Sequence, residues 1–386
     1  MKSILFVIDE NRKGGVSVVL EDIICTLSKE KCKIDLLVLH DQNEMLKNLP
    51  DNVSVIYGTP YFKAVDYSLK QLIKEKNIKL ILKKLRIIFE LKTGFIGKTI
   101  KRERRKILKN SYDIEVAFKD GFTAFFVAYG DSRNKVHWLH SEYKEKNSNS
   151  NYNRMFKKIL PEFDSIVAVS KGVEDQFNSI YHLEGKTEVV RNIVSPAVIL
   201  EKASVDIEGV FNSDDINVVL VGRCHSDKGY DRFLNVVNEL NEKDLLDSLK
   251  FHIIGDGPEK HRLCEYVRFH KLQDRVVFHG RLDNPYQYIK QADCLMLPSR
   301  NESFGLVIVE AQILGTPVIA TDNAATREIV AHNKDGVIVT NSKKGIREGI
   351  LIAKNRDKLK IYKENLAEYR YDNDKSISQI KRILGV

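Results

Sequence analysis

The sequence predicts an α/β protein made of two doubly wound, Rossmann-like domains, and three observations lead to that prediction. The chain has 386 residues, which is more than one hydrophobic core usually serves. Short β-branched runs alternate with helical patterns almost from end to end, which favours βαβ units with parallel sheets. The alternation pauses once, over residues 195–215, and then starts again. We therefore expect a second domain to follow that pause.

The first domain is expected over residues 1–195. Its first strand contains the run "ILFVI", whose continuous apolar character fits a strand that is buried on both faces. A helix from Val16 to Glu30 is predicted to follow it. The predicted strands of this domain cover residues 3–9, 33–40, 53–58, 113–118, 135–140, 165–170 and 187–192.

The second domain is expected over residues 196–356. Residues 195–215 are mixed in character, contain Pro196 and end in polar side chains, so this segment is predicted to be a linker. The predicted strands cover residues 216–222, 250–257, 275–280, 293–299, 317–321 and 336–340. Residues 357–386 have a helical pattern without strands and are predicted to form one or two closing helices.

Composition indicates a soluble globular protein of a reducing compartment. Apolar residues make up 43% of the chain and charged residues 30%, and the five scattered cysteines form no CxxC pair. The apolar run at the N-terminus reaches Asp9 too early for a signal peptide. No run approaches the roughly 18 uninterrupted apolar residues that span a bilayer. We therefore expect a cytoplasmic protein that is peripheral at the inner face of the cell membrane.

The positive charge is concentrated in one block, residues 62–110, which holds sixteen lysines and arginines against four acidic residues. Leu, Ile and Phe interleave with these cations at helical spacing, which is typical of an interfacial helix facing anionic lipid. A solvated helix face is the alternative, and nucleic acid is disfavoured because no zinc-finger, helix-turn-helix or RNP signature accompanies the block. The expected membrane or acceptor surface consists of Lys83, Lys84, Arg86, Lys101, Arg102, Arg104, Arg105 and Lys106.

Gly14 and Gly15 lie between the first predicted strand and the first predicted helix. Paired glycines at such a turn let the backbone approach an anion, which the helix N-terminus favours. A tight turn explains the pair equally well, and the loop lacks the GxGxxG pattern of a dinucleotide site.

Two cations flank a glycine turn at the start of the second domain, in "VGRCHSDKG". Arg223 follows the strand, and Lys228 precedes Gly229 and a predicted helix. Ligands of open α/β sheets bind beyond the carboxyl ends of the strands, and this pair of cations suits a diphosphate there. The next strand ends in a Gly-Asp-Gly turn around Asp256, which is equally well explained as a turn before a helix.

The stretch "NESFGLVIVEAQILG", residues 301–315, carries two carboxylates separated by seven residues. A helix is predicted to begin near Phe304 and Gly305, and its N-terminal amides favour an anion. Glu310 lies in an apolar run, where burial is costly without hydrogen-bond donors such as the hydroxyls of a sugar or a ribose. Glu302 lies in the preceding loop, where an unpaired glutamate costs little.

Together, "VGRCHSDKG", "GDGPE", "ESFGLVIVEAQILGTPVIAT" and the early "KGG" loop resemble the retaining glycosyltransferases of family 4, over essentially the whole chain. The resemblance implies the GT-B fold, in which two Rossmann-like domains face a central cleft. It implies that Glu302 contacts the donor sugar, that Glu310 holds the ribose hydroxyls, and that Arg223 and Lys228 bind the diphosphate. The other donor contacts that it implies involve Gly14, Gly15, the backbone of Phe304, Gly305 and Leu306, and the segment Gly280, Arg281 and Leu282.

His140 matches a histidine that this family places beside the transferred sugar, although a strand-end histidine of the core is the alternative. The catalytic candidates are therefore His140, Glu302, Arg223 and Lys228. No metal or other cofactor is expected, because GT-B enzymes usually need none. The one Asp-x-Asp spacing, at Asp372 and Asp374, lies in the C-terminal segment and is interpreted as a solvated turn.

The resemblance thus implies a metal-independent transferase of cell-surface polysaccharide biosynthesis, such as capsule assembly. It would move a sugar, with retention of configuration, from a nucleotide-diphosphate sugar (UDP-linked) to a glycan or polyprenyl-linked acceptor. Nucleic acid is not expected as a partner. A sugar-nucleotide epimerase of the same fold stays open, as does a non-catalytic nucleotide-sugar-binding protein. The first would need no large basic surface, and the second could lack acceptor-side groups such as His140.

Overall fold

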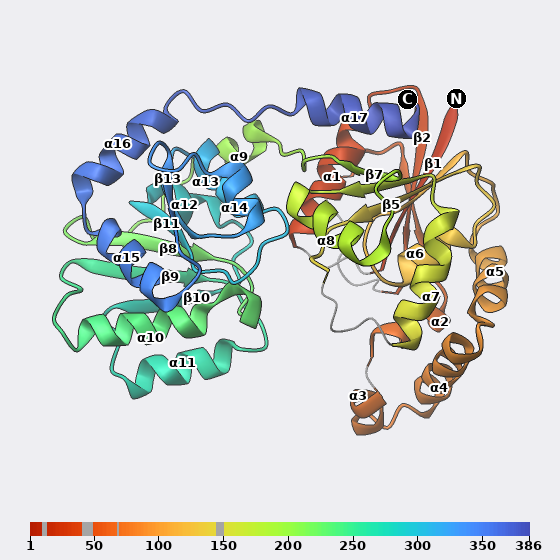
Figure 1. Cartoon of the computed structure of the whole chain (residues 1–386), viewed down its shortest axis with the longest axis horizontal. Helices are drawn as coiled ribbons and strands as arrows, with labels where there is room; N and C mark the ends of the chain where they lie inside the picture. The colour runs from red at the N-terminus through yellow and green to blue at the C-terminus, as the bar shows by residue number, and fades with distance from the viewer. Residues whose placement is uncertain (10–13, 41–48, 68, 144–149) are drawn as a thin grey trace. The chain divides into compact units, whose positions relative to one another are not determined.

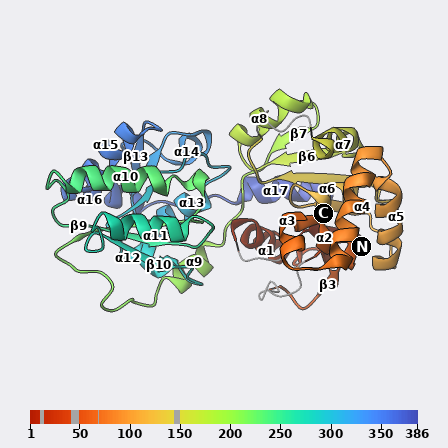
Figure 2. The same ribbon diagram turned by 90° about the horizontal axis from the view of Figure 1, so that it is seen from below.

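The computed structural model describes residues 1–9, 14–40, 49–67, 69–143 and 150–386, and these form two compact units (Figure 1). Unit 1 comprises Met1–Val194 together with Asn373–Val386, and unit 2 comprises Ser195–Asp372. Each unit is a parallel sheet with helices on both faces (Figure 2). The doubly wound α/β architecture predicted from the sequence is therefore confirmed.

The described part of unit 1 contains a seven-stranded parallel sheet in the order β3-β2-β1-β4-β5-β6-β7. The apolar run of residues 4–8 lies in β1, and its side chains are at most 3% exposed, as expected for a strand covered on both faces. The strand order reverses between β1 and β4. The strands are β1 (Lys2–Ile8), β2 (Cys32–Val38), β3 (Val53–Tyr57), β4 (Ile114–Ala117), β5 (Asn134–Leu139), β6 (Ser165–Ala168) and β7 (Thr187–Val189).

The helices of unit 1 connect these strands, and the basic block lies in the group of four between β3 and β4. Within that group, α4 contacts α2, α3 and α5. The helices are α1 (Gly15–Leu27), α2 (Pro60–Asp66), α3 (Leu69–Lys74), α4 (Ile78–Thr93), α5 (Ile96–Ile107), α6 (Phe122–Ala128), α7 (Asn151–Ile159), η2 (Leu160–Glu162), α8 (Lys171–Tyr181) and α17 (Asp374–Leu384).

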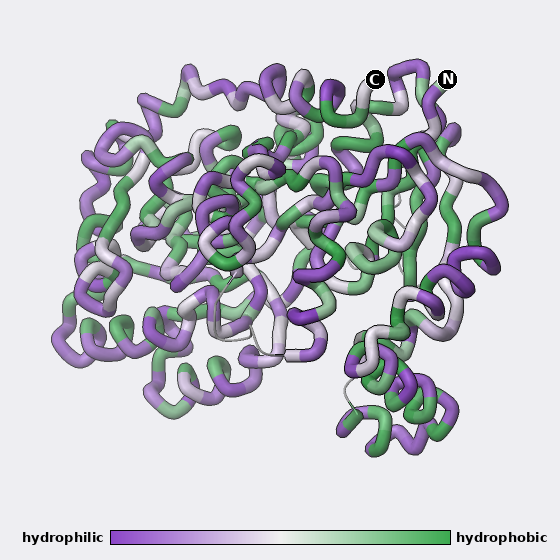
Figure 3. The backbone as a smooth tube through the Cα atoms, turned by 45° about the vertical axis from the view of Figure 1, so that its right-hand side comes forward, coloured by the Kyte–Doolittle hydropathy of each residue, from purple (hydrophilic) through white to green (hydrophobic). Residues whose placement is uncertain are grey.

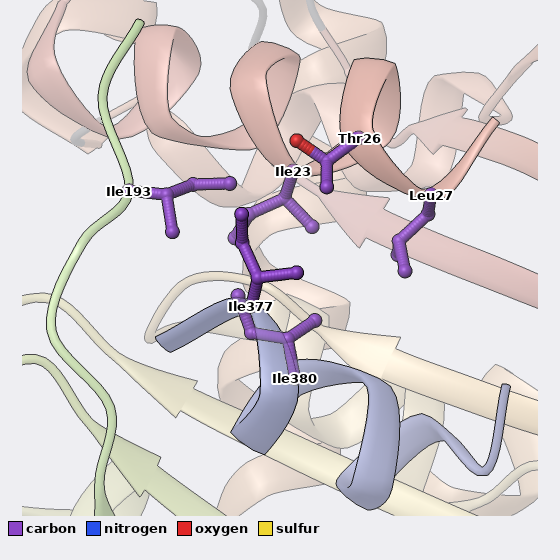
Figure 4. A pocket seen from close by; sticks show the side chains of 6 residues that line it. All are labelled: Ile23, Thr26, Leu27, Ile193, Ile377 and Ile380. Carbon is purple, nitrogen blue, oxygen red and sulfur yellow. The ribbon is translucent and has the colours of Figure 1, made fainter. Parts of the chain in front are cut away.

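The C-terminal helix α17 packs on unit 1 beside α1. Gln379 donates hydrogen bonds to Glu188 and to the carbonyl of Val189, both at 3.0 Å, and Lys381 pairs with Glu30 at 2.7 Å. A small pocket remains between the helices (Figure 4), lined by Ile23, Thr26, Leu27, Ile193, Ile377 and Ile380. Because this lining carries no charged group, the pocket is a gap in apolar packing and does not suit a nucleotide.

Unit 2 has a six-stranded parallel sheet in the order β10-β9-β8-β11-β12-β13, counted over its described residues. Its order reverses between β8 and β11, so the ends of these two strands form the switch point at which ligands of such sheets bind. The strands are β8 (Ile216–Val221), β9 (Leu249–Ile254), β10 (Val276–Gly280), β11 (Cys294–Leu297), β12 (Val318–Thr321) and β13 (Gly336–Val339).

The helices of unit 2 pack around a core centred on β8 and β9, where Phe233 and Phe251 are fully buried. The predicted linker of residues 195–215 is not wholly irregular, because Pro196 begins a helix, α9, as proline does readily at a first helical position. The helices are α9 (Pro196–Lys202), η3 (Ser226–Lys228), α10 (Tyr230–Asn241), α11 (Lys260–Phe269), α12 (Tyr286–Gln291), α13 (Leu306–Ile313), α14 (Ala324–Ile329), α15 (Lys343–Ala353) and α16 (Arg356–Leu366). The segment 357–386 is thus divided between α16 in unit 2 and α17 in unit 1.

Candidate functional site

Two loops of unit 2 meet at the switch point, one after β8 (residues 222–229) and one after β11 (residues 298–305). The guanidinium group of Arg232 donates to the carbonyl oxygen of Pro298 at 2.7 and 3.1 Å, and the backbone N–H of Arg300 donates to the carbonyl of Asp227 at 2.7 Å. Gly229 has φ of +69°, and a Cβ there would lie 2.1 Å from the Pro298 oxygen. Only glycine allows this approach, so the turn after Lys228 is required for the two loops to pack.

Lys228 and Glu302 are brought together by this packing. The ammonium group of Lys228 lies 2.7 Å from Glu302 Oε1, and the hydroxyl of Ser299 donates to the same oxygen at 2.7 Å. Their side chains are 20% and 8% exposed, respectively. Glu302 lies in the loop as predicted, but its side chain is largely buried, and a cation and a hydroxyl compensate its charge.

Arg223 follows β8 as predicted, but its environment differs from that of Lys228. Its side chain is exposed and makes no hydrogen bond or ion pair with the described residues. The backbone of its loop packs closely against the next glycine turn, because a Cβ on Gly255 would lie 1.8 Å from the carbonyl oxygen of Gly222. Arg223 is therefore a cation on a closely packed backbone, available to an anion.

Glu310 lies on α13, which begins after Gly305 in the left-handed conformation (φ +84°), next to the buried Phe304. The predicted start of this helix is correct to within two residues. Glu310 is half-buried, and the hydroxyl of Tyr286 donates to its Oε1 at 3.3 Å. The protein thus supplies a donor to this carboxylate itself, besides the ligand hydroxyls that the sequence suggested. Leu306, the first residue of α13, is half-buried.

The remaining predicted donor residues of unit 2 follow β10. Gly280 ends that strand with φ of +71°, and its carbonyl accepts a hydrogen bond from the N–H of Gly255 at 2.7 Å. Arg281 is exposed and Leu282 is half-buried beyond it. Asp256 caps its own turn, since its carboxylate accepts from the N–H of Gly257 at 2.7 Å and from Lys260 at 2.8 Å.

Gly14 and Gly15 follow β1 at the switch point of unit 1, and His140 follows β5, the neighbour of β4; the loop residues 10–13 lie outside the described part of the chain. Gly14 caps α1 in an extended conformation (φ −171°), so its backbone does not itself require glycine. His140 follows β5, and its ring lies 4.7 Å from that of Phe118. Burial lowers the pKa of His140 to about 3, although the nearby Asp120 opposes the shift. The imidazole is therefore neutral at neutral pH.

A cluster around Asp120 was missed by the sequence reasoning. Asp120 follows β4, and its Oδ1 accepts a hydrogen bond from the Tyr143 hydroxyl and lies 3.4 Å from Nε2 of the fully buried His137. Next to it, Lys119 pairs with Asp9 at 2.9 Å. Three buried polar atoms here, Asp120 Oδ2, His137 Nε2 and His140 Nε2, have no hydrogen-bond partner among the described residues. The sequence did carry a signal for this cluster. The charged residues Lys119 and Asp120 follow the apolar run "DIEVAF", and its strand ends at the same sheet edge as the strand before His140.

The eight cations expected on one surface do not share one environment. Arg104 does not belong to that surface: its side chain is 7% exposed and pairs with Glu115 through two bonds of 2.7 and 2.8 Å. Three more are drawn into local contacts, Lys84 with the carbonyl of Val65, Arg86 with Glu90 and Lys106 with Glu103. Lys83 is half-buried, whereas Lys101, Arg102 and Arg105 are exposed. Arg102 lies 3.5 Å from Glu103.

The residues that the structure describes contain neither a metal-binding cluster nor a membrane-spanning helix. No group of three or more His, Cys, Asp or Glu side chains there has the geometry to hold a metal ion. Within the same residues, no helix combines the length and the apolar character that crossing a bilayer requires.

Comparisons with known proteins bear on the two units differently. Residues 204–370, all in unit 2, match the family described as glycosyl transferases group 1. A protein from Klebsiella pneumoniae, described as an uncharacterized 41.2 kDa protein in the cps region, is 36% identical over 160 residues, which are 40% of this chain and 42% of that protein. The O-antigen biosynthesis glycosyltransferase WclY of Escherichia coli is 29% identical over 42% of this chain and 44% of its own length. The chain thus spans less than half the length of these two curated relatives.

Likeness to solved structures extends over both units. HepE of Anabaena, solved in complex with UDP and glucose, covers 100% of both chains with a TM-score of 0.72 and 19% sequence identity. At that identity the likeness shows the fold alone. The chain therefore has the GT-B fold, and its residues 204–370 match the group 1 glycosyl transferases.

Proposed function

We propose that the chain is a glycosyltransferase that moves a sugar from a UDP-linked donor to a glycan or polyprenyl-linked acceptor in cell-surface polysaccharide biosynthesis. The observation that carries the proposal is the Lys228–Glu302–Ser299 network beside the exposed Arg223, at the switch point of unit 2. These residues lie within the family match, and one relative is an O-antigen glycosyltransferase.

The donor is assigned to unit 2. Arg223 and Lys228 would hold its diphosphate, because an ammonium group has three donors and Lys228 uses one of them on Glu302. Both contacts of Glu302 involve Oε1, so Oε2 is available to a sugar hydroxyl as far as the described residues are concerned. Glu310 would accept hydrogen bonds from the ribose hydroxyls while Tyr286 holds its position. The N-terminal amides of α13 would add to the stabilisation of the phosphate groups.

The reaction follows from these charges. Cleavage of the anomeric C–O bond leaves negative charge on the diphosphate, and Lys228, held by Glu302, would stabilise it together with Arg223 without a metal ion. We place the proposal in family 4 with retention of configuration: the acceptor hydroxyl forms the new bond on the face from which the diphosphate departs. The departing phosphate oxygen takes the hydroxyl proton, so no carboxylate nucleophile is needed.

The acceptor is assigned to unit 1, where the carboxylate of Asp120, whose side chain is 23% exposed, could accept hydrogen bonds from sugar hydroxyls. His140 is neutral and could hydrogen-bond the transferred sugar without adding charge. A polyprenyl-linked acceptor resides in a membrane, so we place the protein at the inner face of the cell membrane, bound peripherally.

The test is a panel of UDP- and GDP-sugars, read by binding and by transfer to lipid-linked and free glycans. Glu310→Gln should weaken nucleotide binding about tenfold, because a ribose hydroxyl loses a charged acceptor, whereas Glu348→Gln on α15 should not. Unchanged nucleotide affinity in Glu310→Gln would remove the ribose assignment. A donor that is isomerised without acceptor would indicate an epimerase, and donor binding without turnover would indicate a binding protein.

A further inference from the structure

Several apolar residues of α3, α4 and the turn after α4 are exposed, and the proposed function gives them no role. Among the described residues, sixteen large apolar side chains are exposed, and seven of them lie between residues 73 and 95. Figure 3 shows this segment as alternating hydrophobic and hydrophilic turns at the edge of unit 1. Scattered apolar residues on a surface need no explanation, but a contiguous group does. The seven are Ile73, Ile78, Leu82, Leu85, Ile88, Phe89 and Phe95.

Four of these residues form a stripe along α4. Ile78, Leu82, Leu85 and Phe89 are 70%, 62%, 48% and 59% exposed, and their spacing of four, three and four residues places them on one helical face. The residues that α4 buries, such as Ile87, lie on the opposite face. The stripe is therefore separate from the face through which α4 packs on the rest of unit 1. Helix α4 has two apolar faces, and only one of them is covered.

The neighbouring helix α5 presents a stripe of cations. Lys98, Lys101, Arg102 and Arg105 share its exposed face, while Ile96 and Ile100 are buried on the other. At the turn between the helices, the ammonium group of Lys98 lies 5.2 Å from the centre of the half-exposed Phe95 ring, so a cation of α5 adjoins one of the seven exposed apolar side chains.

The charge of this helix pair identifies the partner. Residues 78–107 contain eleven lysines and arginines against two glutamates, a net charge of +9 that equals that of the whole chain. The two glutamates, Glu90 and Glu103, are buried in contacts with Arg86 and Lys106. An anionic membrane has acyl chains below negatively charged headgroups. Exposed apolar side chains next to cations, with no exposed acidic group among them, match both layers. A protein partner would have to supply an acidic surface and an apolar groove together.

We infer that the α4 stripe inserts into an anionic lipid bilayer while the α5 stripe binds its headgroups. The inference deepens the proposed function, since it assigns the membrane contact of a lipid-linked acceptor to particular residues. It differs from the set of surface residues expected from the sequence, which named cations only and included Arg104. In the structure the apolar side chains of α4 are the ones that would enter the lipid.

The experiment is flotation of the full chain with vesicles of phosphatidylcholine alone or mixed with phosphatidylglycerol. We expect binding only to the anionic vesicles, weakened by salt. Leu82→Glu with Phe89→Glu should lower the partition coefficient at least tenfold, and the milder pair Leu82→Ser with Phe89→Ser should lower it less. Lys101→Gln, Arg102→Gln and Arg105→Gln together should lower it about 100-fold at low salt.

Matched controls lie in unit 2. Phe269→Glu changes an 82% exposed phenylalanine, and Lys343→Gln, Lys344→Gln and Lys360→Gln remove three exposed cations. Neither control should change binding, and thermal melting should show that every variant folds. Absence of wild-type binding, or equal loss in variants and controls, would overturn the inference. So would a wild-type dimer that Leu82→Glu with Phe89→Glu dissociates, because the stripe would then be covered by a second copy. Flotation needs no turnover, so failed transfer with intact flotation would count against the proposed function alone.

Discussion

The switch points of the two units handle polar side chains in opposite ways. In unit 2 two ion pairs join the loops, Lys228 with Glu302 and Arg300 with Asp231 through two bonds of 2.7 Å, while Arg223 is exposed. In unit 1 three buried polar atoms around Asp120 and His140 have no partner among the described residues, and each such atom costs roughly 1–3 kcal/mol. Unit 2 is thus prepared for a charged group, whereas unit 1 has hydrogen-bonding capacity that neutral hydroxyls could fill.

The strongest test of this comparison is Lys228→Ala. It removes a cation fixed beside the proposed leaving group, so kcat should fall about 100- to 1000-fold in transfer assays. Lys260→Ala is the control, because Lys260 pairs with Asp256 in the neighbouring turn. A loss below tenfold would show that the network of unit 2 is not the leaving-group site.

Asp120→Asn should affect catalysis without affecting the nucleotide. The carboxylate contacts Tyr143 and lies near His137, so kcat should fall about 100-fold if it orients an acceptor hydroxyl. The dissociation constant for UDP, measured by calorimetry, should stay the same. Asp131→Asn, on an exposed loop, is the matched control. Weaker UDP binding in Asp120→Asn would break the division of roles between the units.

The buried histidines extend the comparison to pH. His252 in unit 2 has both ring nitrogens in contacts, with His279 at 3.0 Å and Asn217 at 3.2 Å. Burial, with the nearby His279, lowers its pKa from 6.5 to about 4. As the pH falls, the imidazole of His252 takes up a proton in the unfolded chain before it does so in the folded chain. The free energy of unfolding is therefore undiminished by this group above about pH 6.5 and decreases as the pH falls toward 4.

Because of this group, we expect the free energy of unfolding to be about 2 kcal/mol lower at pH 5 than at pH 7. Hydrogen exchange of β9 and β10 is the suitable measurement, because the single tryptophan, Trp138, lies in unit 1. His252→Gln should flatten this pH dependence, whereas His261→Gln on the surface of α11 should not. Equal slopes in the two variants would contradict the assignment.

Tyr286→Phe should have the smallest effect. It removes the hydroxyl that donates to Glu310, a contact of 3.3 Å, so UDP should bind about two- to tenfold more weakly. Tyr288→Phe, on the same helix, is the control for a lost tyrosine hydroxyl. An effect as large as that of Glu310→Gln would mean that Tyr286 itself contacts the ligand.

The sheets could be predicted from the sequence because parallel strands that are buried on both faces leave continuous apolar runs. The strand predicted at residues 216–222, for example, is β8 at Ile216–Val221. The candidate residues of unit 2 could also be found, because a strand end, a glycine turn and a helix start lie within one short stretch. The contact of Lys228 with Glu302 could not be predicted, since it depends on loops that meet across 74 residues of sequence.

Asp120 and Arg104 show two other limits. A single aspartate at a strand end does not form a sequence motif with a second residue at a fixed spacing. Its cluster with Tyr143 and His137 therefore appears only after folding. Arg104 looks like its neighbours in a basic run, but Glu115 lies in a buried strand and needs a buried cation. That carboxylate, within the apolar run "DIEVAF", was the sequence signal that a cation of the block would be internal.

The return of α17 to unit 1 has a consequence for the chain's topology. The chain leaves unit 1 after Val194 and re-enters it at Asn373, and these residues are hydrogen-bonded: Asn373 accepts from the N–H of Val194 at 3.1 Å and donates to its carbonyl at 2.8 Å. Unit 2 is thus an inserted domain whose entry and exit adjoin. Joining Val194 directly to Asn373 would give unit 1 as a single continuous polypeptide that retains the helix covering Ile23 and Leu27.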